Sequence, residues 1–177
     1  MRLARAPAAL LAGAVAIAVN IALLDGFDAA GIPTAHGGLQ KLVKLWASPP
    51  LAALGADRLW TGLGLPGPET PPFMLGFKVG VALVMALIYA LLIAPRWQHR
   101  PLWAGLVAAL LFWIANAAIV LPLLGEGFAG MSTLSGLGIL CFALAHTGFF
   151  LVLALLHDRL AAQPGNGWPV LSGRNRL

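Results

Sequence analysis

Four long apolar stretches dominate the chain, over about residues 7–24, 73–94, 103–123 and 133–156. A helix needs about 20 mostly apolar residues to cross roughly 30 Å of hydrocarbon. Because lipid offers no hydrogen-bond partners, the backbone of each stretch must satisfy its own polar groups as a helix. The stretches are continuously apolar rather than alternating, which argues against a transmembrane β-barrel. The pattern therefore predicts an all-α, polytopic membrane protein with a bundle of four transmembrane helices.

Charged residues between these stretches predict the orientation of the chain. One side carries most of the basic residues at the helix ends, namely Arg2, Arg5, Arg96, Arg100, Arg159, Arg174 and Arg176. The other side carries acidic residues, namely Asp25, Asp28, Asp57, Glu69 and Glu126. Lysine and arginine concentrate on the cytoplasmic side of membrane proteins. Both termini are therefore expected in the cytoplasm.

The loop over residues 25–72, predicted to be external, has a pattern of its own. Residues 38–46 place apolar side chains on one helical face and two lysines on the other, which predicts an amphipathic helix in the membrane interface. A second short helix is expected over 51–60, separated from the first by Pro49-Pro50. The loop is too short and too rich in Gly and Pro to bury a core.

Composition supports a single membrane domain. The chain has 177 residues, of which 60% are hydrophobic and 10% charged, whereas a soluble domain has about a quarter charged residues. The net charge of +5 does not predict nucleic-acid binding, because the basic residues lie at helix ends. Residues 1–162 are expected to form the domain and 163–177 a flexible cytoplasmic tail. Interfacial anchors are expected at Trp46, Trp60, Trp97 and Trp103.

Small residues at helical spacing predict where the helices touch, because membrane helices associate through close packing. The candidate contact positions are Ala8, Ala12, Ala16, Asn20, Gly76, Gly80, Ala82, Ala86, Ala90, Gly105, Ala109, Gly138, Cys141, Ala145 and Gly148. Gly76 and Gly80 form a GxxxG motif. These stripes predict a compact bundle.

Four polar residues within the apolar stretches are candidates for a ligand site or for helix packing, because polar groups are costly in lipid. His146 could bind haem, a pigment or a metal, relay protons, or hydrogen-bond a neighbouring helix through Asn116 or Asn20. Lys78 could bind an anionic group or extend its amine to the interface. Asn116 and Asn20 are interpreted chiefly as hydrogen-bonding groups between helices. Tyr89 is interpreted as an interfacial anchor.

Familiar catalytic chemistry has no signature in the chain. There is no Walker A, HExxH or GxSxG motif and no carboxylate within a predicted span. Cys141 is the single cysteine, so no CxxC metal motif exists. His146 has no second histidine at its depth, because His99 and His157 are expected at the cytoplasmic ends. A non-enzymatic protein without a metal or cofactor is predicted, with haem or pigment binding through His146 as an alternative.

The second half of the chain resembles an uncharacterised group of small bacterial four-helix membrane proteins. The features that carry the resemblance lie in residues 76–80, 89–90, 121–128 and 145–149. It extends over about residues 73–157 and implies the same architecture in a bacterial cytoplasmic membrane. Members of the group often carry a histidine where Lys78 stands here, so the resemblance does not imply a paired-histidine site.

Three functions remain open at this point. The absence of catalytic groups and the interfacial loop favour an accessory or structural subunit of a larger membrane assembly. Alternatively, Lys78, Asn116 and His146 could line the path of a small oligomeric transporter or channel for a neutral or anionic solute. Pigment or haem binding is the third. The expected partners are membrane lipids and either another membrane protein or further copies of the chain.

Overall fold

The computed structural model describes residues 6–34, 38–97 and 99–162, which fold into helices and connecting turns without a strand. Four helical spans are long and apolar enough to cross a membrane: Ala6–Ala29, Pro71–Arg96, Pro101–Leu123 and Gly136–Ala161. The predicted four-helix membrane bundle is therefore confirmed. The predicted tail over 163–177, with Arg174 and Arg176, lies outside the described residues, and so do Arg2 and Arg5.

A long segment that carries two short helices separates the first span from the second, and shorter turns join the remaining spans. In chain order they are α1 (Ala6–Ala29), α2 (Gly38–Ala53), α3 (Ala56–Gly62), α4 (Pro71–Ile88), the π-helical η2 (Tyr89–Ile93), the 3-10 turn η3 (Ala94–Arg96), α5 (Pro101–Ala115), the π-helical η4 (Asn116–Val120), α6 (Leu121–Leu123), the 3-10 turn η5 (Phe128–Gly130) and α7 (Gly136–Ala161). We call the end of the bundle that carries α2 and α3 the loop end.

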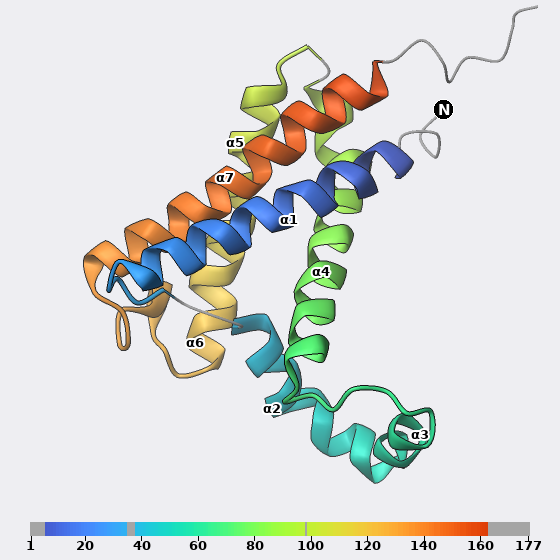
Figure 1. Ribbon diagram of the computed structural model, residues 1–177. Helices are drawn as coiled ribbons and strands as arrows, with labels where there is room; N and C mark the ends of the chain where they lie inside the picture. Colours follow the sequence, from blue (N-terminus) through green and yellow to red (C-terminus); the bar gives the residue numbers. More distant parts are fainter. Residues whose placement is uncertain (1–5, 35–37, 98, 163–177) are drawn as a thin grey trace, which may run out of the picture.

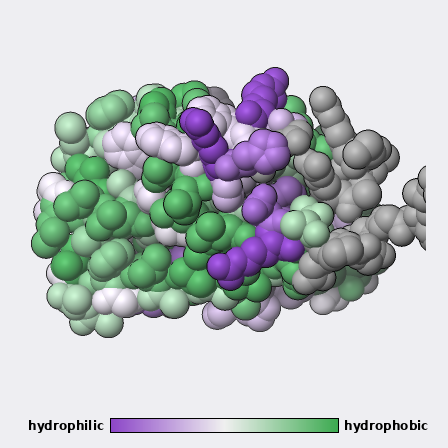
Figure 2. Space-filling model, turned by 90° about the horizontal axis from the view of Figure 1, so that it is seen from above, coloured by the Kyte–Doolittle hydropathy of each residue, from purple (hydrophilic) through white to green (hydrophobic). Residues whose placement is uncertain are grey.

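The four spans pack unevenly (Figure 1). Helix α1 lies along α7, α5 packs on another side of α7, and α4 packs mainly against α1. The second span approaches α5 chiefly through η2 and η3, at the end opposite the loop end. Seen from that end, hydrophilic residues gather beside a largely apolar surface (Figure 2). Four charged residues at or next to the ends of η3, α5 and α7 are exposed, namely Arg96, Arg100, Asp158 and Arg159.

Most of the predicted small-residue contacts are confirmed. Ala12, Ala16 and Ala86 are fully buried between α1 and its neighbours. On α5, a Cβ added to Gly105 would lie 3.0 Å from the Phe150 carbonyl oxygen of α7. Removing side-chain bulk at these positions lets the helix backbones approach closely.

The GxxxG motif does not mark a contact within the chain. Gly76 and Gly80 are exposed, and a Cβ added to either would meet nothing within 4 Å. Helix α4 instead turns Ala82 and Ala86 toward the core. Successive residues are about 100° apart around a helix. Gly80 and Ala82 therefore face nearly opposite directions, and only one of these two stripes can face α1.

Prolines explain the two π-helical turns. Pro95 lies two residues after η2, and Pro122 lies two residues after η4. Proline lacks the N–H and its ring clashes with the carbonyl four residues earlier. Widening the preceding turn relieves that clash: the Leu121 N–H donates to the Asn116 carbonyl, five residues back. Pro122 thus widens the last turns of the third span, which ends one residue later at Leu123.

The amphipathic helix predicted over 38–46 is present as the first part of α2, but the predicted break at Pro49-Pro50 is wrong. Both prolines lie inside α2. They are exposed, so the carbonyls that lose N–H partners can be solvated. The break comes at Gly55, whose φ of 75° is in the left-handed region that glycine tolerates.

Candidate functional site: a pocket among the four spans

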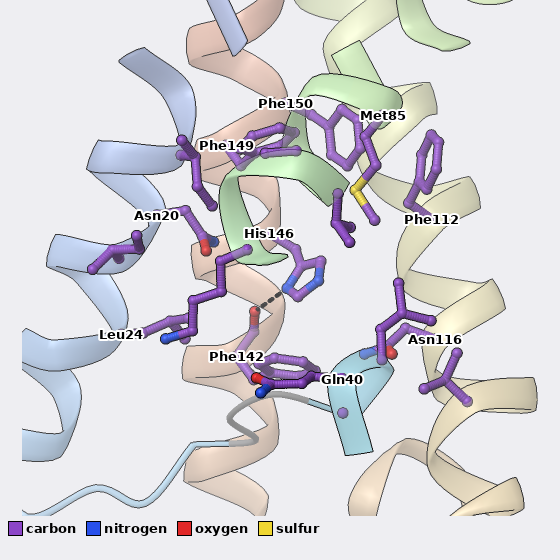
Figure 3. Close-up of a pocket in the computed structure, with 18 of the residues that line it drawn as sticks. Asn20, Leu24, Gln40, Met85, Phe112, Asn116, Phe142, His146, Phe149 and Phe150 are labelled. Atoms are coloured by element: carbon purple, nitrogen blue, oxygen red, sulfur yellow. Dashed lines mark hydrogen bonds between the residues drawn. The ribbon is translucent and has the colours of Figure 1, made fainter. Parts of the chain in front are cut away.

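All four polar candidates line one pocket, with a volume of about 270 Å³. Asn20 comes from α1, Lys78 from α4, Asn116 from η4 and His146 from α7. Gln40 of α2 also lines the pocket, although the sequence did not single it out. Figure 3 shows His146 projecting from α7 into the space between α1 and the third span. Residues far apart in the chain thus converge on one site.

Lys78 and His146 lie well inside the bundle, away from its loop end. Helices rise 1.5 Å per residue, so Lys78 lies about 10 Å along α4 from Pro71. His146 lies about 15 Å along α7 from Gly136. Both positions fall within spans of membrane-crossing length. The site is therefore at the depth of the hydrocarbon, in the half nearer the loop end.

His146 hydrogen-bonds its own helix. Its Nδ1 lies 3.2 Å from the Phe142 carbonyl oxygen, one turn earlier in α7. A carbonyl can only accept, so Nδ1 carries the proton, and a neutral ring then leaves Nε2 as an acceptor. The suggested hydrogen bond from His146 to Asn116 or Asn20 is absent from the part of the chain described.

Asn20 forms the contact between helices that the sequence predicted. It is 9% exposed, and its Nδ2 donates to the Ala145 carbonyl oxygen of α7 at 2.9 Å. This hydrogen bond joins α1 to α7 inside the bundle. The amide oxygen, Oδ1, is left to accept.

Gln40 is a buried polar residue that the sequence pattern concealed. It is 4% exposed, and its Nε2 donates to the Pro68 carbonyl oxygen at 3.3 Å. Its Oε1 is buried without a hydrogen-bond partner among the described residues. Position 40 lies one residue after Leu39 in an amphipathic helix, so helical periodicity alone suggested no burial there.

Lys78 and Asn116 are half-buried and form no hydrogen bond or ion pair with the residues described. The interpretation of Asn116 as a hydrogen-bonding link between helices is therefore wrong within this chain. Asn116 is the first residue of η4, and π-helical turns often occur at functional sites. Both side chains keep donor groups for a molecule in the pocket.

Aromatic and aliphatic side chains make up the rest of the wall. The rings of Phe112 and Phe150 stack with centroids 4.8 Å apart, and Phe149 meets Phe150 edge-on at 4.9 Å. Met85 and Phe142 also line the pocket (Figure 3). A pocket that is mostly apolar with a few convergent polar groups is typical of sites for small ligands.

Helix α2 covers the pocket at the loop end. Its first residues, Gly38 to Gln40, line the pocket. Two ion pairs hold the helix across the bundle: Lys41 Nζ lies 3.1 Å from Glu126 Oε1, and Lys44 Nζ lies 2.6 Å from Glu69 Oε1. Each such exposed pair contributes about 0–1 kcal/mol. The lysines predicted on the polar face of α2 thus connect it to the acidic loops.

A groove between the second and third spans adjoins the pocket. This groove, with a volume of about 470 Å³, shares Phe112 and Ala115 with the pocket. Ile88, Leu92 and Leu111 line it and are exposed on the outer surface of the bundle. The groove therefore faces the surroundings of the helices, where lipid would lie.

A second, smaller pocket of about 180 Å³ lies at the opposite end. His157 and Tyr89 line it, are 4% and 2% exposed, and meet edge-on with ring centroids 5.7 Å apart. The interpretation of Tyr89 as an interfacial anchor is wrong, because it faces α7. Helical spacing from the buried Leu153 could have indicated that His157 faces inward.

The predicted tryptophan anchors differ in their surroundings. Trp46 is 63% exposed and Trp103 57%, whereas Trp97 is half-buried. The Trp60 indole N–H donates to the Pro66 carbonyl oxygen at 2.8 Å, and its ring meets Phe73 edge-on. Trp60 thus also holds the turn between α3 and α4, and the anchoring role of all four stays a prediction.

No protein family, curated protein or solved structure matches this chain. The resemblance to small bacterial four-helix membrane proteins stays a prediction. Among the described residues, no three histidine, cysteine or acidic side chains are grouped closely enough to hold a metal ion.

Proposed function

We propose that the protein binds a small amphipathic molecule inside the membrane, in the pocket that His146, Lys78, Asn116, Asn20 and Gln40 line. The convergence of these five polar side chains in an otherwise apolar pocket is the observation that carries the proposal. Polar groups at this depth are costly unless they are paired. A bound ligand with a polar head would pair them.

Helix packing alone explains only part of this polar cluster. Asn20 joins α1 to α7 through the Ala145 carbonyl. Asn116 and Lys78 form no hydrogen bond within the described part of the chain, and His146 bonds only its own helix. Side chains that held helices together would bond across them. These three residues therefore fit a ligand better than they fit structure.

The charge of the pocket favours a neutral or anionic head group. Lys78 is the one cationic residue in the lining of the pocket, and no aspartate or glutamate lines it. The same site would serve a small transporter for such a solute. Transport requires that the solute also cross from one side of the membrane to the other, so binding is the simpler function to test first.

Native mass spectrometry of the full chain in nanodiscs tests the proposal. We expect a bound amphiphile that Lys78→Met and Asn116→Leu each reduce at least tenfold, while Gly80→Ala on the exposed face of α4 leaves it unchanged. If neither co-purified nor added amphiphiles bind, the proposal is wrong. An absorption spectrum of the same sample tests the pigment alternative, which predicts a band beyond the protein absorption.

We also propose that the chain lies in a bacterial cytoplasmic membrane with both termini in the cytoplasm. The position of Arg96, Arg100 and Arg159 at the end opposite α2 supports this orientation. On a Cys141→Ala background, Asp57→Cys should react with an impermeant maleimide in intact cells, and Arg159→Cys should not. The reverse labelling would overturn the orientation.

An accessory role in a larger membrane assembly is the second candidate. The segment formed by α2 and α3 exposes large apolar side chains, with Leu54 at 82%, Leu63 at 74% and Leu59 at 71%. Exposed apolar patches of this kind mark membrane or protein contacts. A partner in native membranes should co-migrate with the chain in mild detergent, and Leu59→Asp should release it. A solitary chain would count against this role.

A further inference from the structure

We infer that the head of the bound molecule is rich in hydroxyl groups, and that its single apolar chain lies in the groove between the second and third spans. This inference rests on the proposed function. It names the class of ligand: a single-chain amphiphile whose head donates at least two hydrogen bonds and accepts at least one.

The first argument is that three side chains keep free acceptors, because backbone carbonyls take the one donor of the His146 ring and one of the two N–H donors of each amide. Asn20 Nδ2 donates to Ala145, and Gln40 Nε2 donates to Pro68. His146 Nδ1 donates to Phe142. These partners are carbonyl oxygens, so the direction of each hydrogen bond is determined by chemistry. Each amide keeps one N–H, and three acceptors remain: Asn20 Oδ1, His146 Nε2 and Gln40 Oε1, of which Gln40 Oε1 is buried without a hydrogen-bond partner among the described residues.

The second argument is that the remaining polar groups are donors or mixed. Lys78 offers only donors, and the Asn116 amide offers both a donor and an acceptor. A head that can only accept, such as a carboxylate, an ester or a quinone, would satisfy Lys78 and face unmatched acceptors elsewhere. A head with two hydroxyls, such as a glycerol or a hydroquinone, can donate to His146 and accept from Lys78 at once.

The third argument concerns the path of the chain. Helix α2 and its ion pairs cover the loop end of the pocket, which leaves the adjoining groove as the path for the chain. Ile88, Leu92 and Leu111 line this groove, together with Trp97 and Arg96. Every side chain shared between the pocket and the groove is apolar, namely Phe112 and Ala115. An apolar chain that leaves the pocket through this groove stays in contact with lipid, and the ligand can enter from the bilayer.

Two matched pairs of probes test the donor requirement on the unmodified protein in nanodiscs. The first pair is a monoacylglycerol and the methyl ester of the same fatty acid. The second is a short-chain benzoquinol and its quinone. We expect the hydroxyl-bearing member to bind at least tenfold more tightly in one or both pairs, because sites built for a hydroxyl reject analogues that lack it. The pair with the larger preference distinguishes a lipid from a quinol.

The outcomes separate this inference from the proposed function. If no probe binds, both are wrong. If both members of each pair bind equally, the ligand pocket stands and the hydroxyl requirement falls. His146→Phe should reduce the preference at least fivefold without abolishing binding of the ester. Because the probe pairs are compared on the unmodified chain, the test does not depend on folding of this variant.

A second measurement tests the groove. Ala115→Trp places a large side chain where the pocket meets the groove, and Ala118→Trp places the same side chain on an exposed position of η4 outside both. We expect Ala115→Trp to slow association of the preferred probe at least tenfold and Ala118→Trp to leave it unchanged. Equal rates for the two variants would rule out entry through the groove.

Discussion

Replacing glycine by alanine should have opposite effects at two positions of this bundle. A Cβ added to Gly13 of α1 would lie 2.7 Å from the Ala86 Cβ of α4, whereas one added to Gly80 would meet nothing within 4 Å. Alanine favours a helix over glycine by about 1 kcal/mol. That gain applies to both variants, so comparing them isolates the cost of the contact.

The cost at Gly13 can be estimated from the geometry. Nonbonded carbon atoms prefer separations of about 3.5–4.0 Å, so α1 and α4 must move apart by about 1 Å to admit the new methyl group. Overpacking of this kind costs typically about 1–3 kcal/mol. Gly80→Ala should therefore stabilise the protein by up to about 1 kcal/mol, and Gly13→Ala should be about 1–3 kcal/mol less stable than Gly80→Ala.

Unfolding in mixed detergent micelles with increasing SDS, followed by circular dichroism, measures the two free energies. Ala86→Gly provides the control, because it removes the atom that the new methyl group meets. The double variant Gly13→Ala with Ala86→Gly should show favourable coupling in a double-mutant cycle. If Gly13→Ala is as stable as Gly80→Ala, or if Ala86→Gly gives no rescue, the packing of α1 on α4 described above is wrong.

Three further predictions follow from the contacts. Asn20→Leu removes the hydrogen bond between α1 and α7 and should lower the unfolding free energy in the same assay by about 0.6–2 kcal/mol; an unchanged value would contradict the role assigned to it. Lys41→Glu or Glu126→Lys alone should increase hydrogen exchange in residues 38–53, and the two together should restore protection, with the effect fading at high salt; identical exchange in all three variants would contradict the tether. Cys141 is buried and should react with maleimide only after SDS unfolding; rapid labelling of the folded protein would contradict the burial.

The sequence indicated only some of the polar residues that line the pocket. Polar residues are rare in apolar stretches, so each one can be recognised without knowing its neighbours in space. The sequence therefore indicated His146, Lys78, Asn116 and Asn20. Their meeting in one pocket could not be predicted, since it depends on how four helices rotate about their axes. Gln40 gave no signal, because its burial depends on α2 lying across the bundle.

Proline widens the preceding helical turn for a reason that is local to the sequence. Pro95 and Pro122 each follow a π-helical turn by two residues. The clash with the carbonyl four residues earlier is local, so the sequence already contained the reason for widening. Both spans end one residue after the proline, at Arg96 and at Leu123.

The sequence alone determined the number of spans, because hydrocarbon thickness and the demands of the backbone act on each stretch separately. It also marked the small residues at which helices touch. Tertiary structure decided which small-residue stripe of α4 faces inward, since the stripe with Ala86 packs on α1 while Gly80 faces out. When a span is apolar on every side, its sequence does not indicate which face of the helix packs toward the other helices. Contacts with neighbouring helices supply that information, and they alone place the polar groups of the four spans around one pocket.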